Sequence, residues 1–116
     1  MTSQKNKETK KQTQANEKQK IGKYVQSQFA LLVEMGWISE LEINNLLDFE
    51  YSKSTFDLNF PFLRRREKGR SDQKGYPRYY ATSFMLNEQE YYLCSQWYDR
   101  QQTKVADWIM KIKSQK

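Results

Sequence analysis

The chain of 116 residues contains no histidine and a single cysteine, Cys94. A serine or cysteine nucleophile needs a neighbouring base, which in most such sites is histidine. Zinc is held in proteins mainly by histidine and cysteine side chains. The composition therefore predicts a protein that is not an enzyme and that uses neither a metal nor another cofactor. A single cysteine also excludes a disulfide within the chain, which is typical of a cytoplasmic protein.

Long hydrophobic runs are missing as well. The longest apolar run extends only from Phe29 to Val33, whereas a transmembrane helix needs about 20 apolar residues. The N-terminus has no apolar stretch of the kind found in a signal peptide. The four glycines, at positions 22, 36, 69 and 75, lie too far apart to form a glycine-rich phosphate loop. We therefore expect no membrane partner and a cytoplasmic location.

Residues 1–20 contain no aromatic residue and no valine, isoleucine or leucine. Such a segment buries too little apolar surface to offset the entropy lost on ordering, so it predicts a disordered tail. The tail has six lysines and two glutamates. A basic arm of this kind either attracts nucleic acid or only increases solubility. Residues 21–116 are then one small domain with a modest core.

Two helices are predicted in the first half of this domain. Apolar residues recur at helical spacing over residues 21–35, and Gly36 provides a stop. Ser39 and Glu42 have the spacing of a capping box, in which each residue satisfies a backbone N–H of the other. This signal predicts a second helix over residues 40–48.

A third, short helix is expected before the first proline of the chain. Ser52 or Ser54 has a side chain suited to cap its start, because the hydroxyl accepts a hydrogen bond from a free N–H of the first turn. We expect this helix to end at Asn59, because Phe60 precedes Pro61 and a residue in that position avoids helical backbone.

The second half has the pattern of strands followed by a helix. Residues 78–86 and 90–95 are rich in tyrosine and alternate in character, and residues 87–89 can form a tight turn between them. Residues 62–66 can add a third strand. Apolar spacing predicts a last helix over residues 96–113. The expected fold class is α+β, with three N-terminal helices, a β-hairpin or three-stranded sheet and a C-terminal helix.

Positive charge is concentrated in residues 64–78. This segment has seven basic and two acidic residues, and its two glycines and one proline predict a flexible loop. Arginine binds phosphate well because its planar guanidinium makes two parallel hydrogen bonds. The candidate phosphate-binding residues are Arg64, Arg65, Arg66, Lys68, Arg70, Lys74 and Arg78. The alternative is a solvated loop whose charges only keep the protein soluble.

Three helices followed by a small sheet resemble a winged helix-turn-helix domain, in element order and over residues 21–113. In that family the third helix commonly enters the major groove of DNA, and the wing contacts the neighbouring backbone. The resemblance implies that residues 64–78 form a long wing. It also implies a recognition element that presents Ser52, Lys53, Ser54 and Asn59 to DNA.

Two functions fit these features. The first is a non-enzymatic protein that binds nucleic acid, with duplex DNA favoured over RNA, such as a transcription regulator of a bacterium or mobile element. Binding of single-stranded RNA is a variant in which an exposed Tyr79 or Tyr80 stacks on an unpaired base. The alternative is a protein-interaction module, an adaptor or small phage-type inhibitor, because acids are concentrated in residues 38–60 and bases in residues 64–78. The periodicity of the last helix leaves open whether it packs on its own domain or pairs in a homodimer.

Overall fold

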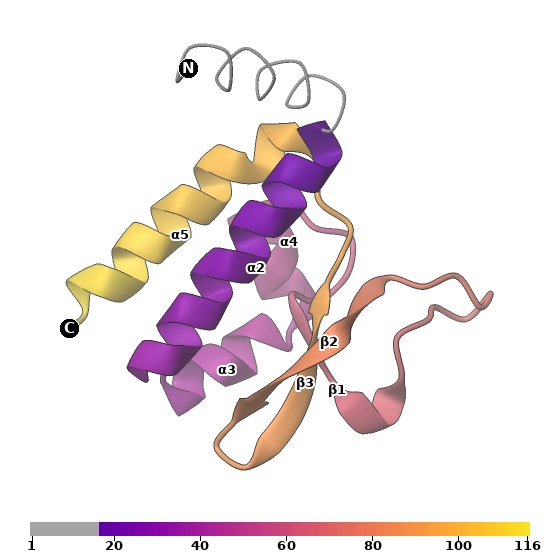
Figure 1. Ribbon diagram of the computed structural model, residues 1–116, viewed down its shortest axis with the longest axis horizontal. Coiled ribbons are helices and arrows are strands. Elements are labelled where there is room, and N and C mark those ends of the chain that lie inside the picture. Colours follow the sequence, from indigo (N-terminus) through magenta and orange to yellow (C-terminus); the bar gives the residue numbers. More distant parts are fainter. Residues whose placement is uncertain (1–16) are drawn as a thin grey trace, which may run out of the picture.

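The computed structural model describes residues 17–116 of the chain. This part contains the α-helices Glu17–Met35 (α2), Glu40–Leu46 (α3), Phe49–Phe56 (α4) and Gln102–Ser114 (α5). Its strands are Leu63–Arg65 (β1), Tyr79–Leu86 (β2) and Gln89–Cys94 (β3), and two 3-10 helices, Arg66–Lys68 (η1) and Asp99–Gln101 (η2), follow β1 and precede α5. The predicted α+β class is confirmed (Figure 1). None of the helices within residues 17–116 is both long and apolar enough to span a membrane.

The predicted disordered tail falls largely outside the described residues. Its last four residues, 17–20, are an exception, because they form the first turn of α2. The inner side of α2 follows the predicted apolar spacing, and its buried residues are Ile21, Val25, Phe29 and Leu32. Gly36 ends the helix with a left-handed φ of 72°. The N–H groups of Gly36 and Trp37 donate to the carbonyl oxygens of Val33 and Leu32, each at 3.0 Å, which is a Schellman motif.

Helix α3 begins at the predicted cap. Ser39 Oγ accepts a hydrogen bond of 3.1 Å from the N–H of Glu42, which confirms Ser39 as the N-cap. The Glu42 carboxylate does not complete a capping box. It points into the core, where it accepts hydrogen bonds from Trp108 Nε1 at 2.7 Å and from the Tyr51 hydroxyl at 2.6 Å. The helix is shorter than predicted because Asp48 is the N-cap of α4.

Helix α4 begins earlier than predicted, and neither Ser52 nor Ser54 caps it. The carboxylate of Asp48 accepts a hydrogen bond of 2.8 Å from the N–H of Tyr51, which fixes the start of the helix at Phe49. The end is also earlier than predicted, because Asp57 adopts a left-handed backbone with φ of 63° and directs the chain away. Ser52 and Ser54 therefore lie inside the helix rather than at its start.

The sheet has the strand order β1-β3-β2, and both neighbouring pairs are antiparallel. The predicted third strand is confirmed, because β1 pairs with β3 in the register Leu63↔Leu93. The β2–β3 hairpin turns at Asn87 and Glu88, with φ angles of 51° and 67°. Two-residue hairpin turns require this left-handed backbone. β1 and β2 are the edges of the sheet, so residues 66–78 connect one edge to the other (Figure 1).

The segment between β3 and α5 corrects the predicted start of the last helix. Trp97 was expected in its first turn, but the indole Nε1 of this residue donates a 2.7 Å hydrogen bond to the carbonyl oxygen of Cys94. The Trp97 ring packs 5.7 Å from Phe62 and 6.1 Å from Phe56. Tyr98 then has extended backbone, with φ of −124° and ψ of 153°. An extended connection is needed to bury Trp97, and α5 therefore starts only at Gln102.

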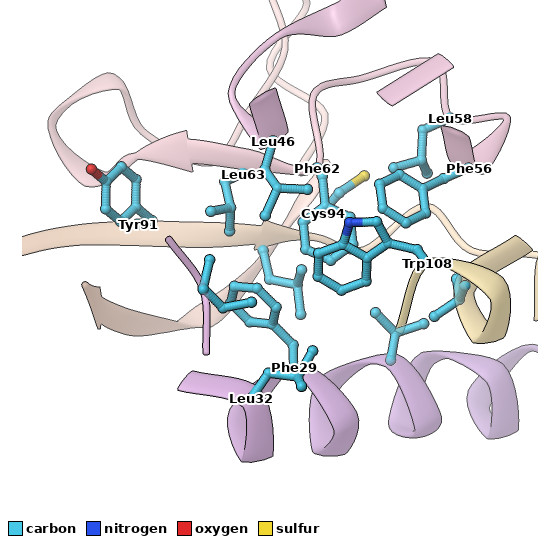
Figure 2. Packing of buried hydrophobic residues seen from close by; sticks show 14 of the residues in the cluster. Phe29, Leu32, Leu46, Phe56, Leu58, Phe62, Leu63, Tyr91, Cys94 and Trp108 are labelled. Carbon is cyan, nitrogen blue, oxygen red and sulfur yellow. The ribbon is translucent and has the colours of Figure 1, made fainter. Parts of the chain in front are cut away.

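An aromatic cluster forms the centre of the core, between α2, α4, α5 and the sheet (Figure 2). The Phe56 and Phe62 rings are 4.7 Å apart, and the Phe29 and Phe62 rings are 5.3 Å apart with an edge-to-face angle of 60°. Trp108 packs against all three phenylalanines. Each fully buried large apolar side chain contributes about 1.5–3 kcal/mol. Trp97 and Trp108 are each 3% exposed and belong to this core.

Candidate functional site

The basic segment, residues 64–78, begins in β1 and ends one residue before β2. Because β1 and β2 each pair with β3 and not with one another, this segment is not the loop of a hairpin. The predicted long wing is therefore a connection between the sheet edges. The hairpin of this sheet is β2–β3, and its turn contains Glu88 rather than a base.

Hydrogen bonds order the far end of the basic segment, which was predicted to be flexible. Asp72 Oδ1 accepts from the N–H groups of Lys74 at 2.9 Å and Tyr76 at 3.0 Å. The Asp72 N–H donates to the Tyr76 carbonyl, and the Arg78 N–H donates to the Arg70 carbonyl. Desolvation acts to raise the pKa of Asp72, but hydrogen bonds from the Tyr76 N–H, Arg78 and the Lys74 N–H outweigh it and lower this pKa. A charged Asp72 therefore holds the turn together.

Four of the seven predicted phosphate-binding side chains are engaged within the protein. The Arg64 guanidinium lies 4.5 Å over the Tyr79 ring and donates to the Ser71 carbonyl at 2.9 Å. Arg70 Nε donates to the Tyr79 carbonyl at 3.2 Å. Arg66 and Arg78 form ion pairs of 2.9 Å with Glu90 and Asp72. The carboxylates neutralise Arg66 and Arg78, whereas Arg64 and Arg70 contact only neutral groups, so sequence counting overestimated the charge available to a ligand.

The other three predicted phosphate-binding residues, Arg65, Lys68 and Lys74, are not engaged in this way. Their side chains are exposed, and no hydrogen bond or ion pair joins them to another residue within 17–116. Arg65 is the last residue of β1, Lys68 ends η1, and Lys74 lies in the turn made by Asp72. A cation without a carboxylate partner keeps its full attraction for an external anion.

Arg65 and Lys68 border a hollow of about 370 Å³, which we call the cationic groove. Its lining consists of Leu47, Pro61, Leu63, Arg64, Arg65 and Lys68. Three of these residues are apolar and three are basic, and no acidic side chain is among them. The groove forms where the end of α3 meets the segment that leads into β1, and η1 turns Lys68 back towards the same place. It is therefore a local surface of one charge sign.

The predicted recognition element is only partly available to a ligand. Ser52 is fully buried, where its hydroxyl accepts from the Phe62 N–H at 2.8 Å and lies 3.5 Å from the Leu46 carbonyl. This corrects its assignment as a DNA contact. Lys53, Ser54 and Asn59 are exposed. Lys53 is held by Asn59 Oδ1 at 3.1 Å and by the carboxylate of Asp57 at 3.6 Å.

A second hollow, of about 260 Å³, brings Asn59 and Arg78 together with residues that the sequence did not single out. We call it the aromatic pocket, and its lining includes Asn59, Phe60, Arg78, Gln96, Tyr98 and Arg100. Asp57 and Gln101 complete the lining. Gln101 closes it by donating from Nε2 to the Asp57 carbonyl at 2.8 Å, across 44 positions of sequence. No local pattern could have indicated this pairing of distant segments.

The tyrosines predicted to stack on single-stranded RNA are not free to do so. Tyr79 is 1% exposed, and its hydroxyl donates to the Pro61 carbonyl at 2.7 Å. Tyr80 is half-buried against α2, where a Cβ added at Gly22 would come within 2.5 Å of its hydroxyl oxygen. Desolvation raises the pKa of both tyrosines. Tyr76 and Tyr98 are the exposed tyrosines of residues 17–116, and the guanidinium groups of Arg78 and Arg100 lie over their rings.

No group of three or more acidic, histidine or cysteine side chains within residues 17–116 is gathered so that it could hold a metal ion. The chemical groups that the groove and the pocket offer to a ligand are cationic, amide and aromatic side chains. In comparisons of the whole chain, no protein-family model, no curated protein and no solved structure matches it.

Proposed function

We propose that the protein is a non-enzymatic nucleic-acid-binding domain that holds the phosphate backbone in its cationic groove. One observation carries this proposal: Arg65 and Lys68 are exposed, have no partner within the described chain and share a groove without a carboxylate. Arg64 lies in the same lining with its guanidinium already positioned over Tyr79. A preorganised arginine loses little side-chain entropy on binding, which favours contact with phosphate.

Duplex DNA is the preferred partner in this proposal, through a winged-helix-like arrangement. Three helices precede a sheet whose β2–β3 hairpin has the place of a wing, and α4 exposes Lys53 and Ser54. Glu88 in the hairpin turn would repel phosphates, whereas the charge of Glu90 is paired with Arg66. The backbone contacts are therefore assigned to the cationic groove, and base contacts in the major groove would fall to α4.

The salt dependence of binding tests this assignment. If Arg64, Arg65 and Lys68 each neutralise one phosphate, log Kobs against log salt has a slope of roughly −2.7 on duplex DNA. Replacing Arg65 and Lys68 by alanine should make the slope less steep by about 1.8. The assay is fluorescence anisotropy of a labelled random duplex, titrated at several salt concentrations.

The matched control is Lys104→Ala/Lys113→Ala, which removes the same charge from exposed positions of α5. It should leave the slope almost unchanged. Equal effects of the two double variants would mean that only net charge matters and would remove the groove from the proposal. Absence of any duplex binding at low salt would remove the proposed function itself.

A protein-interaction module is the second candidate, and a different observation favours it. Leu41 at the start of α3 is 71% exposed, and Phe49 at the start of α4 is 42% exposed. Exposed large apolar side chains between acidic residues are typical of a surface that a protein partner covers. Co-purification of a stoichiometric protein after nuclease treatment, lost on Leu41→Glu, would favour this function over the first.

A further inference from the structure

We infer that the aromatic pocket receives one unstacked base of a single-stranded nucleic acid whose backbone lies along the cationic groove. The inference rests on the proposed function, since the groove supplies the contact with phosphate. It adds a base-binding site that only an unpaired base can enter, whereas the duplex contacts of the proposed function use the groove alone.

The walls offer flat faces that suit a base. Tyr98 is 42% exposed, and the Arg100 guanidinium lies 5.2 Å from its ring centre. Elsewhere in the lining, the Arg78 guanidinium lies 5.1 Å from the centre of the Phe60 ring. Aromatic rings and guanidinium planes are the surfaces on which proteins stack unpaired bases, and stacking tolerates any base because each has a π-face.

Asn59 supplies the polar group that can recognise a base edge. Its Oδ1 accepts from Lys53 at 3.1 Å, whereas its Nδ2 makes no hydrogen bond to another residue of the described chain. Two donors are thus available for a carbonyl or ring nitrogen of a base. Gln101 cannot serve, because its Nε2 binds the Asp57 carbonyl and its Oε1 accepts from the Tyr98 N–H at 2.7 Å.

The charge of the pocket is compatible with a nucleotide. Its one carboxylate, Asp57, is approached by Lys53 at 3.6 Å and by Arg100 at 3.5 Å. Arg100 is 65% exposed in this ion pair. Exposed pairs of this kind contribute little to stability, so the guanidinium can turn towards a phosphate at small cost.

Size and position select one base of a strand rather than a larger ligand. The pocket volume of about 260 Å³ lies below the roughly 300–1,000 Å³ of sites for drug-sized molecules. Phe60 lines the pocket and the next residue, Pro61, lines the cationic groove, so the two sites are adjacent along the chain. A base in a duplex would first have to leave its stack, which favours single-stranded segments.

Single-stranded oligonucleotides of one length, with and without bases, test the inference by fluorescence anisotropy. Tyr98→Ala should weaken binding of a base-containing oligonucleotide by about 5-fold to 150-fold, the range for loss of one stacking contact. Asn59→Ala should weaken it less, because stacking remains. Neither variant should change affinity for the abasic oligonucleotide. Tyr98→Phe keeps the stacking face and should bind like the unmodified protein.

Tyr76→Ala is the matched control, because Tyr76 is 58% exposed but does not line the pocket. Parallel titrations with DNA and RNA of one sequence identify the source of the base, and base-dependent binding of either supports the inference. If Tyr98→Ala and Asn59→Ala bind base-containing strands normally, or lose abasic binding equally, the pocket does not hold a base. The titration with duplex DNA tests the proposed function separately, because binding of the duplex depends on Arg65 and Lys68 and not on the pocket.

Discussion

Replacing the buried Glu42 by alanine should destabilise the domain more than replacing any of the exposed acids of α3 or α4. Glu42 is 5% exposed, and its carboxylate accepts from Trp108 Nε1 at 2.7 Å, Tyr51 Oη at 2.6 Å and Asn45 Nδ2 at 3.3 Å. Desolvation, followed by the hydrogen bond to Glu42, raises the pKa of Tyr51, so this hydroxyl remains a donor at neutral pH. One carboxylate thus links α3, α4 and α5.

The expected cost follows from the group left behind. Trp108 is 3% exposed, so its indole N–H would lose its partner in a place that water does not reach easily. A buried donor without an acceptor costs about 1–3 kcal/mol, and hydrogen bonds to charged groups contribute about 1.5–3 kcal/mol. We expect Glu42→Ala to lower the free energy of unfolding by about 2–3 kcal/mol in total. For a domain of this size the melting temperature should fall by roughly 8–24 °C.

Urea denaturation followed by circular dichroism measures this free energy. Glu40→Ala is the matched control, since Glu40 is also acidic, lies in the same first turn of α3 and is exposed. Its loss removes a comparable interaction with the helix dipole, worth about 0.3–1 kcal/mol. In a double-mutant cycle, Glu42→Ala should cost less once Trp108→Phe has removed the donor. Equal losses for Glu42→Ala and Glu40→Ala, or strict additivity with Trp108→Phe, would refute the reasoning.

Two further predictions concern packing. Gly22→Ala should lower stability by about 1 kcal/mol, because the new methyl group would clash with the Tyr80 hydroxyl oxygen, 2.5 Å away. In a Tyr80→Phe background the same change should become neutral or stabilising by up to about 1 kcal/mol, since alanine is a better helix former than glycine. Thermal melts of the unmodified protein, the two single variants and the double variant measure this difference. Burial raises the pKa of the Cys94 thiol to about 12. At pH 8 the folded protein should therefore react with a thiol reagent only as fast as it unfolds, and fast labelling without urea would contradict the buried position.

The basic segment illustrates why counting charges predicts a surface poorly. Arg64, Arg65 and Arg66 are chemically equivalent in sequence, yet one stacks on Tyr79, one is free within the described chain and one pairs with Glu90. Strand geometry separates Arg64 from Arg65, because neighbouring side chains of β1 point to opposite faces of the sheet, and Arg66 already lies in η1. Their partners come from β2 and β3, and the pairing register decides which residues meet.

Helix boundaries in this protein depended on competition between equally good local signals. Asp48, Ser52 and Ser54 all have side chains that can cap a helix. Asp48 caps α4 in the folded chain, and the resulting helix places Ser52 inside, where it binds the Phe62 N–H. With Ser52 inside, the backbone N–H of Phe62 at the entry to β1 has a hydrogen-bond partner. Phe62 lies ten residues from Ser52, so a local sequence pattern does not reveal this contact.

Sequence by itself determined the features that short-range chemistry controls. Apolar spacing located α2, Ser39 marked the start of α3, and alternation with turn residues identified the hairpin, while a third strand over residues 62–66 was one of two alternatives. The sequence also established that basic residues are concentrated in residues 64–78. Tertiary structure alone decided which of those basic side chains remain available to a ligand. It also assembled the aromatic pocket from residues between Asn59 and Arg100. The reason is physical, because a side chain's partner is chosen by spatial proximity and desolvation after the chain has packed.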